Sequence, residues 1–183
     1  SQYLAALVLI SFSLPSYADP APAQFSIFDF NAPNKSEVRG VRLAAIYGKS
    51  GSVTGIDFSF GLSELDNMKG VSFPLLIGAN RVNNSMTGLG IGIINLHQGS
   101  DKGVNLGLVN LTNDVQGLNG GLANISTGTT LADIGLVNVS DTSTFQLAFF
   151  NRTEFLEGLQ IGLLNCASNG FLPCFPIFNF AAD

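Results

Sequence analysis

Hydrophobic and polar residues alternate along short stretches of this chain. In residues 158–165, for example, Leu159, Ile161 and Leu163 are separated by Gln and Gly. The same alternation occurs over residues 89–93, 104–108 and 145–149. Successive side chains of a β-strand point to opposite faces, so alternation at period two is typical of strands rather than helices. The pattern therefore predicts an all-β protein with about ten short strands.

The alternating stretches recur as copies of one repeat. A glycine followed by a hydrophobic residue opens most copies, at Gly40, Gly55, Gly70, Gly88, Gly103, Gly117 and Gly158. An asparagine closes the later copies, at Asn95, Asn110, Asn124, Asn138, Asn151, Asn165 and Asn179, with successive members 13 to 15 residues apart. The linkers are rich in Asn, Asp, Ser, Thr and Gly, which favour turns. We interpret the asparagines as a structural column located in turns.

Two all-β architectures are compatible with this repeat. In a β-solenoid the copies stack by translation, so stacked asparagine amides hydrogen-bond to the copies above and below. An antiparallel barrel grows by hairpins and repeats best at two strands, roughly 28 residues here. The repeat is clearest at one strand, which favours a β-solenoid of about ten 13–15-residue coils. An up-and-down outer-membrane β-barrel of about ten strands stays open as the alternative, because the strands approach the length that a membrane strand needs.

The chain divides into four segments. Residues 1–18 carry no charge, centre on an apolar run and end in Ser-Tyr-Ala, so they are predicted to be a secretory signal peptide that is truncated at its start. Residues 19–37 form an expected N-terminal cap, 38–170 the repeat domain and 171–183 the C-terminal cap. The caps differ from the repeat because an open apolar edge would promote aggregation.

Composition excludes several classes of function. Hydrophobic residues make up 46% of the chain and charged residues only 11%, with a net charge of −5. Intrinsic disorder requires the opposite balance. Eight basic residues against thirteen acidic ones leave no basic footprint for nucleic acid.

The C-terminal copies carry a resemblance to a known family. Residues 158–165 read GLQIGLLN, followed by NGFLP at 169–173 and FPIFNF at 175–180. These segments resemble a family of exported bacterial surface-repeat proteins built on a G-L-Q-I/L-G-L-x-N repeat. The resemblance covers most of residues 37–180 and is most specific in the last two copies. It implies a location in the cell envelope or at the surface, with no established enzyme activity and no catalytic residues.

The repeat also generates motifs of another kind. Asn110, Asn124, Asn138 and Asn151 are each followed two residues later by Ser or Thr, which matches the glycosylation pattern. Because their spacing equals the repeat, a structural column explains them better than modification does. The hydroxyl residues of these motifs form an expected ordered row that would suit an ice- or polysaccharide-binding face, namely Thr112, Ser126, Ser140 and Thr153.

Few residues offer other chemistry. Cys166 and Cys174 form either a disulfide or a pair of buried thiols, and the sequence leaves both readings open. The single histidine, His97, follows Asn95 in an expected turn, so we predict that it is exposed. Acidic residues stand singly in the expected linkers, at Asp57, Asp101, Asp114 and Asp141. The sequence therefore predicts no catalytic residues, no metal and no cofactor.

Two functions from different classes follow. The first is a non-enzymatic exported repeat protein, a structural or adhesive element of the bacterial cell envelope or surface, which would be soluble without detergent. The alternative is an outer-membrane β-barrel that acts as a pore or anchor. The candidate partners are envelope components, surface polysaccharide and a membrane; nucleic acid is not among them.

Overall fold

A computed structural model describes residues 19–74 and 78–182, so the predicted signal peptide, residues 1–18, lies outside the described residues. In this part the chain forms fourteen strands and no helix. The strands are β1 (Ala21–Phe28), β2 (Phe30–Ala32), β3 (Glu37–Ser59), β4 (Leu62–Pro74), β5 (Ala79–Ile91), β6 (Ile94–His97), β7 (Ser100–Leu106), β8 (Val109–Thr112), β9 (Asp114–Gly120), β10 (Ala123–Ser126), β11 (Thr129–Ile134), β12 (Val137–Leu147), β13 (Phe150–Ala167) and β14 (Cys174–Phe180).

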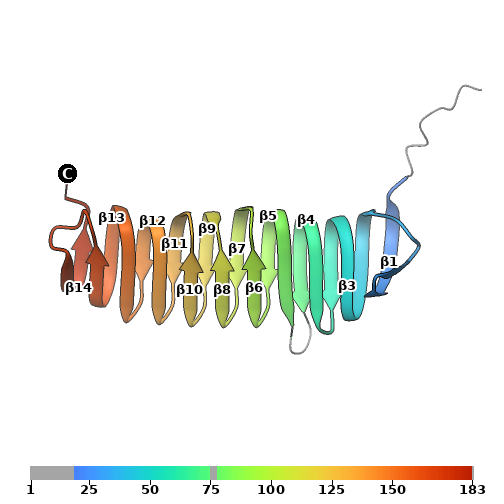
Figure 1. The fold of residues 1–183 in the computed structure, drawn as a ribbon, viewed down its shortest axis with the longest axis horizontal. Helices are drawn as coiled ribbons and strands as arrows, with labels where there is room; N and C mark the ends of the chain where they lie inside the picture. The colour runs from blue at the N-terminus through green and yellow to red at the C-terminus, as the bar shows by residue number, and fades with distance from the viewer. Residues whose placement is uncertain (1–18, 75–77, 183) are drawn as a thin grey trace, which may run out of the picture.

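The strands form a parallel β-solenoid of about 9 turns. Figure 1 shows the coils stacked along one axis as a straight rod, with β1 near one end and β14 at the other. Each middle coil has a long strand followed by a short one, as in β7 and β8, and both pair in parallel with their equivalents in the next coil. This confirms the predicted solenoid. The barrel alternative is wrong, because its neighbouring strands would run antiparallel.

The glycines that open the copies from Gly40 to Gly103 allow the backbones of neighbouring coils to approach closely. Gly103 has a φ of 140°, and a Cβ there would lie 1.9 Å from the carbonyl oxygen of Gly88 in the preceding coil. Gly55, Gly70 and Gly88 have the same positive φ and meet the preceding glycine in the same way. A residue with a side chain cannot occupy these positions without moving the coil below it.

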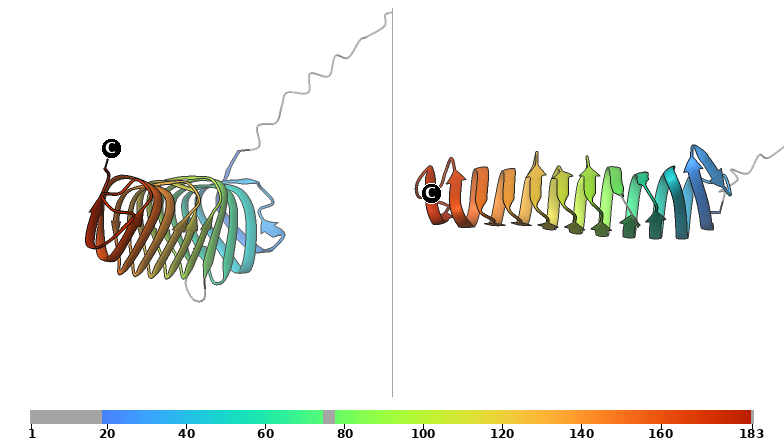
Figure 2. Two further views of the ribbon diagram at one scale, coloured as in Figure 1. Left: turned by 60° about the vertical axis from the view of Figure 1, so that its left-hand side comes forward. Right: turned by 90° about the horizontal axis from the view of Figure 1, so that it is seen from below.

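Antiparallel strands lie at both ends of the rod. At the N-terminal end β1 joins β3 in parallel, while β2 folds back on β1. At the C-terminal end β14 pairs antiparallel with β13, and a disulfide joins Cys166 to Cys174. Figure 2 shows these two ends flanking the regular stack of coils.

The interior of the solenoid is largely polar. A hydrophobic cluster lies in the N-terminal coils beside buried polar residues, and it consists of Val38, Val53, Leu65, Met68, Val82 and Met86. Beyond these coils most of the buried side chains are Asn, Gln, Ser, Thr or Asp. Many large hydrophobic side chains lie on the outside instead, with Ile46 and Leu163 each 68% exposed. The arrangement is the reverse of the usual one for a protein surrounded by water.

Candidate functional site

An asparagine ladder runs through the interior and sets which side of each coil faces inward. The amide of Asn95 donates to the side-chain oxygen of Asn110 at 2.7 Å, and Asn110 donates to Asn124 at 2.7 Å. The ladder continues to Asn165 with donor–acceptor distances of 2.8 to 3.0 Å. It begins one coil earlier than the sequence predicts, because Asn80 donates to Asn95 at 3.2 Å.

Two features of the asparagine column differ from the prediction. Its members lie within strands, with Asn110 the second residue of β8, and they are not in turns. The last predicted member, Asn179, is not part of the ladder, since antiparallel β14 places it opposite Gln160. Its amide donates instead to the backbone oxygens of Asn165 and Leu172.

A second interior column converges on the carboxylate of Asp133. From one side Asn105 donates to Asn119, which donates to Asp133 Oδ1 at 2.9 Å. From the other side Gln160 donates to Gln146, which faces Asp133 Oδ2. A carboxylate accepts from both directions without supplying a donor of its own. Burial raises the pKa of Asp133, and the hydrogen bonds that it accepts oppose this rise.

The row of hydroxyl residues is buried, so the predicted ice- or polysaccharide-binding face is wrong. Thr112 and Ser126 are 2.6 Å apart inside the solenoid, and Ser140 donates to Thr153 at 3.3 Å. These residues follow the ladder asparagines by two positions, so alternation turns them inward as well. The glycosylation motifs have buried asparagines for the same reason, which supports their interpretation as a structural column.

His97 occupies the inward column of Thr112 and Ser126, so the prediction of an exposed histidine is wrong. It is buried and its Nδ1 hydrogen-bonds to Asp101, which also accepts from Asn105 at 2.7 Å. Asp101 and Asp57 are therefore interior residues and not linker residues. Asp57 forms a buried ion pair with Arg42 at 2.7 Å and accepts a hydrogen bond from Ser63.

The outer surface of the long strands is hydrophobic over the whole stack. We call this surface the long face, and two outward columns form it. The first consists of Ile56, Val71, Leu89, Val104, Leu118, Ala132, Phe145 and Leu159, and the second of Phe58, Phe73, Ile91, Leu106, Gly120, Ile134, Leu147 and Ile161. No charged residue stands in either column.

The short strands form a second hydrophobic surface, which we call the short face. Its outward columns in the middle and C-terminal coils are Ile94, Val109, Ala123, Val137 and Phe150, and Leu96, Leu111, Ile125, Val139 and Arg152. The N-terminal coils carry Lys49, Glu64 and Arg81 in the second of these columns. The short face is therefore hydrophobic along most of its length, with charged residues near its N-terminal end and Arg152 at its C-terminal end.

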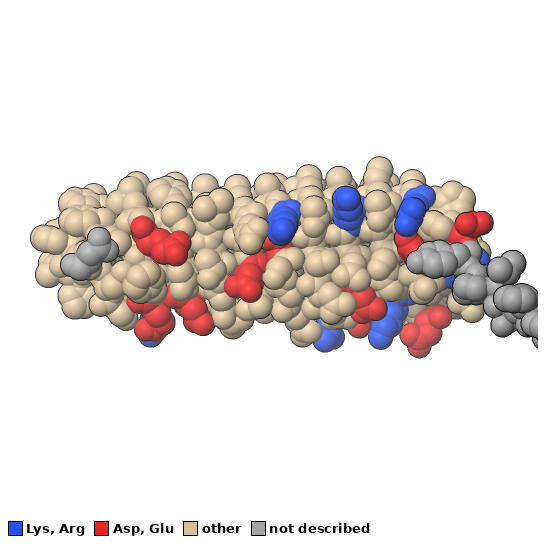
Figure 3. All heavy atoms as spheres, turned by 90° about the horizontal axis from the view of Figure 1, so that it is seen from above, with Lys and Arg blue, Asp and Glu red and all other residues tan. Residues whose placement is uncertain are grey.

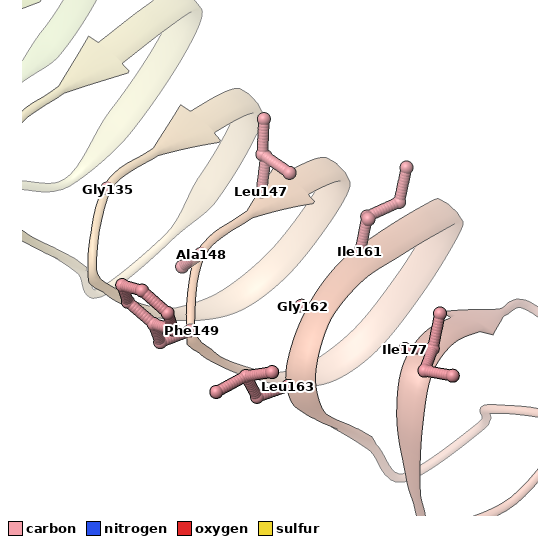
Figure 4. Close-up of a pocket in the computed structure, with 8 residues that line it drawn as sticks. All are labelled: Gly135, Leu147, Ala148, Phe149, Ile161, Gly162, Leu163 and Ile177. Carbon is pink, nitrogen blue, oxygen red and sulfur yellow. The ribbon is translucent and has the colours of Figure 1, made fainter.

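The corner that joins the long face to the short face is also hydrophobic. This apolar edge consists of Ile46, Phe60, Ile93, Leu108, Leu122, Leu136, Phe149 and Leu163. Six of these residues precede a ladder asparagine by two positions, so their spacing from the asparagines marks this corner in the sequence. A groove of about 390 Å³ lies beside the edge at its C-terminal end, between Phe149, Leu163 and Ile177 (Figure 4).

The opposite corner carries polar and charged side chains. This polar edge consists of Arg39, Thr54, Lys69, Thr87, Lys102, Gln116, Leu131, Thr144 and Glu157, together with the turns beside them, such as Asn113–Asp114. Leu131 is its hydrophobic exception. Figure 3 shows Lys, Arg, Asp and Glu side chains spread along this side of the rod. In cross-section the solenoid therefore has two hydrophobic faces and a hydrophobic edge, with one polar edge.

The arrangement provides hydrophobic binding and little other chemistry. In the part of the chain that the structure describes, no group of three His, Cys, Asp or Glu residues is placed to hold a metal ion. The described residues also contain no helix that could span a membrane. Comparisons of the chain with protein-family models, with curated proteins and with solved structures found no match.

Proposed function

We propose that this chain is a non-enzymatic, exported repeat protein that acts as a structural element of the bacterial cell envelope. It attaches to other envelope components through its hydrophobic outer surface. The observation that carries this proposal is the inversion of the solenoid, with hydrogen-bonded ladders inside and hydrophobic columns outside. A monomer surrounded by water seldom exposes hydrophobic surface on this scale, and such a surface marks an interaction site.

Three further observations support export. The disulfide between Cys166 and Cys174 is of a kind that persists in oxidising compartments outside the cytosol. Residues 158–180 resemble exported bacterial surface-repeat proteins, and residues 1–18 have the composition of a signal peptide. A pore is not part of this proposal, because the interior columns of the solenoid are filled by side chains.

The hydrophobic exterior changes what we expect of the purified protein. The sequence favoured a mature protein that is soluble without detergent, on the assumption that polar residues face the solvent. With hydrophobic residues on three sides, we expect the mature protein to require detergent or an envelope partner to remain dispersed.

Fractionation of bacteria that express the full chain behind a basic signal-peptide start, Met-Lys-Lys, tests the proposal. We expect the protein in the envelope fraction, cleaved after Ala18. A matched variant that lacks residues 1–18 should stay inside the cell. Recovery of the full chain in the soluble cytosolic fraction, uncleaved and with Cys166 and Cys174 reduced, would contradict export and envelope attachment together.

A further inference from the structure

We infer that the solenoid lies within one leaflet of a lipid bilayer, with its long axis parallel to the membrane plane. The apolar edge enters the hydrocarbon, the two faces contact acyl chains, and the polar edge lies among the headgroups. This inference deepens the proposed function by naming phospholipid as the partner, and it rests on that function for the presence of the protein in the envelope.

The position of the charges sets the orientation of the rod. Charged residues occur on the polar edge from Arg39 in the first coils to Glu157 near the last. If the rod stood upright across a bilayer, the middle of this edge, including Lys69 and Lys102, would be in hydrocarbon, at a large cost in free energy. If the rod lies flat, all of these side chains reach the headgroup region at once. The charged residues of the short face all stand in its column nearest the polar edge, so the same boundary accommodates them; they are Lys49, Glu64, Arg81 and Arg152.

The depth of the hydrophobic surface matches one leaflet. In the coil that contains β7, five residues separate Lys102 on the polar edge from the corner at Gly107. At roughly 3.3 Å per strand residue this distance is about 16 Å. The hydrocarbon core of a bilayer is about 30 Å thick, so one leaflet supplies about 15 Å. The apolar edge therefore reaches the middle of the bilayer when the polar edge is at the headgroups.

A second copy of the chain covers too little of this surface. A two-fold interface buries one continuous patch on each partner, about 1,000–2,500 Å² even in an obligate homodimer. Because the two hydrophobic faces point in opposite directions, a dimer can cover one of them and leaves the other face exposed. Lipid covers both faces and the edge together, which favours lipid as the partner.

The backbone at the apolar edge disfavours a bound peptide. The corner amides are already paired, since Gly121 N–H donates to the carbonyl of Ile134, Gly135 N–H to Leu147 and Ala148 N–H to Ile161. A peptide strand added along this groove would find no donor at these corners. The side chains that line the groove are all hydrophobic, so it suits a hydrocarbon chain.

Single tryptophans test the orientation, because the natural chain contains none. The variants Gln116→Trp, Leu118→Trp and Leu122→Trp place the probe on the polar edge, the long face and the apolar edge of one coil. Each full-length mature variant is mixed with phosphatidylcholine vesicles whose lipids carry bromine near the headgroup or near the acyl-chain end. Leu136→Trp is the equivalent of Leu122→Trp one coil further and replaces it if that variant does not fold.

We expect the tryptophan to lie deeper in the bilayer in the order Gln116→Trp, Leu118→Trp, Leu122→Trp. The emission of Leu122→Trp should shift to the blue on vesicle addition and be quenched several-fold more by deep bromine than by shallow bromine. Gln116→Trp should show the reverse preference and remain accessible to iodide in water. Equal depth for all three probes would overturn the flat orientation. Absence of vesicle binding by a protein that sediments as a dimer would assign the surface to a second copy, and envelope fractionation of the natural chain would still decide the proposed function.

Discussion

Each ladder asparagine uses both N–H bonds of its amide. Asn124 donates one to Asn138 at 2.8 Å and the other to the carbonyl of Ile134 at 3.0 Å, while its oxygen accepts from Asn110. The ladder amides therefore find their hydrogen-bond partners within the protein, which is the condition for burying them. The ladder thereby allows the hydrophobic residues of each coil to remain outside.

Removal of one ladder asparagine should therefore lower the free energy of unfolding. Asn124→Ala leaves one N–H of Asn110 and the side-chain oxygen of Asn138 without partners, while the carbonyl of Ile134 keeps only its bond from Gly121 N–H. We expect the free energy of unfolding to fall by about 3 kcal/mol, because each buried unpaired group costs about 1–3 kcal/mol. Urea unfolding followed by circular dichroism measures it. The control is Gln116→Ala on the polar edge, whose free energy of unfolding should lie within about 0.5 kcal/mol of that of the natural protein. Equal losses of unfolding free energy in both variants would contradict the role of the ladder.

Asp133 should make stability depend on pH. Burial raises the pKa of Asp133 above its ordinary value of 3.8, so at pH values between the two the folded state holds a proton that the unfolded state has lost. The unfolding free energy should therefore fall as the pH rises from about 4 through the raised pKa. In Asp133→Asn this part of the fall should be absent. Unfolding of both proteins over a pH series provides the comparison, and identical profiles would show that Asp133 does not titrate in this way.

At the scale of a strand, the stacking of glycine on glycine sets how closely coils approach. A Cβ at Gly103 meets the backbone oxygen of Gly88, which cannot move without displacing its own coil. A Cβ at Gly120 meets the Cδ2 atom of Leu106 at 2.9 Å, and that atom is the end of a flexible side chain. The two glycines stand in successive coils, and they differ in this neighbour and in the positive φ that Gly103 has and Gly120 lacks.

The substitutions Gly103→Ala and Gly120→Ala form a matched pair. We expect the first to lower the free energy of unfolding by about 3 kcal/mol or more, because it combines an unfavourable φ with overpacking against backbone. The second should cost less than about 1 kcal/mol, since Leu106 is half-exposed and can change rotamer. Thermal unfolding under identical conditions measures both, and equal destabilisation would argue against close stacking at Gly103.

The sequence was sufficient to predict the strands and their parallel stacking, because the period and alternation are local properties. It did not reveal which side of each strand faces inward. Residues 104–108 alternate equally well in either orientation, and the ladder that decides between them joins residues 13 to 15 positions apart. His97 and Thr112 were misplaced for this reason. Their inward position follows only after the side chain of Asn110 is known to lie inside.

At the scale of the molecule, low charge and repetition have one structural explanation. A solenoid that leaves three of its four sides to a hydrophobic environment has room for charge mainly along the remaining edge. Interior charges persist where they are paired or accept several hydrogen bonds, as at Arg42, Asp57 and Asp133. The distribution of hydrophobic side chains around the rod, and not any single pocket, is therefore the property that a functional test must alter.

Three substitutions on the apolar edge alter the hydrophobic surface of the rod without changing the interior ladders. Leu108, Leu122 and Leu136 stack in successive coils and are 50%, 50% and 43% exposed. Changing all three to Asn removes about 1 kcal/mol of hydrophobic transfer free energy at each position, so transfer into detergent micelles should weaken by about a hundredfold. Circular dichroism should stay unchanged, because side chains at this edge add little to the interior. The matched control changes three residues of the polar edge to Asn, namely Lys102, Gln116 and Thr144, and should leave transfer into micelles unaltered. If both triple variants transfer equally well, hydrophobic contact at the apolar edge does not govern association.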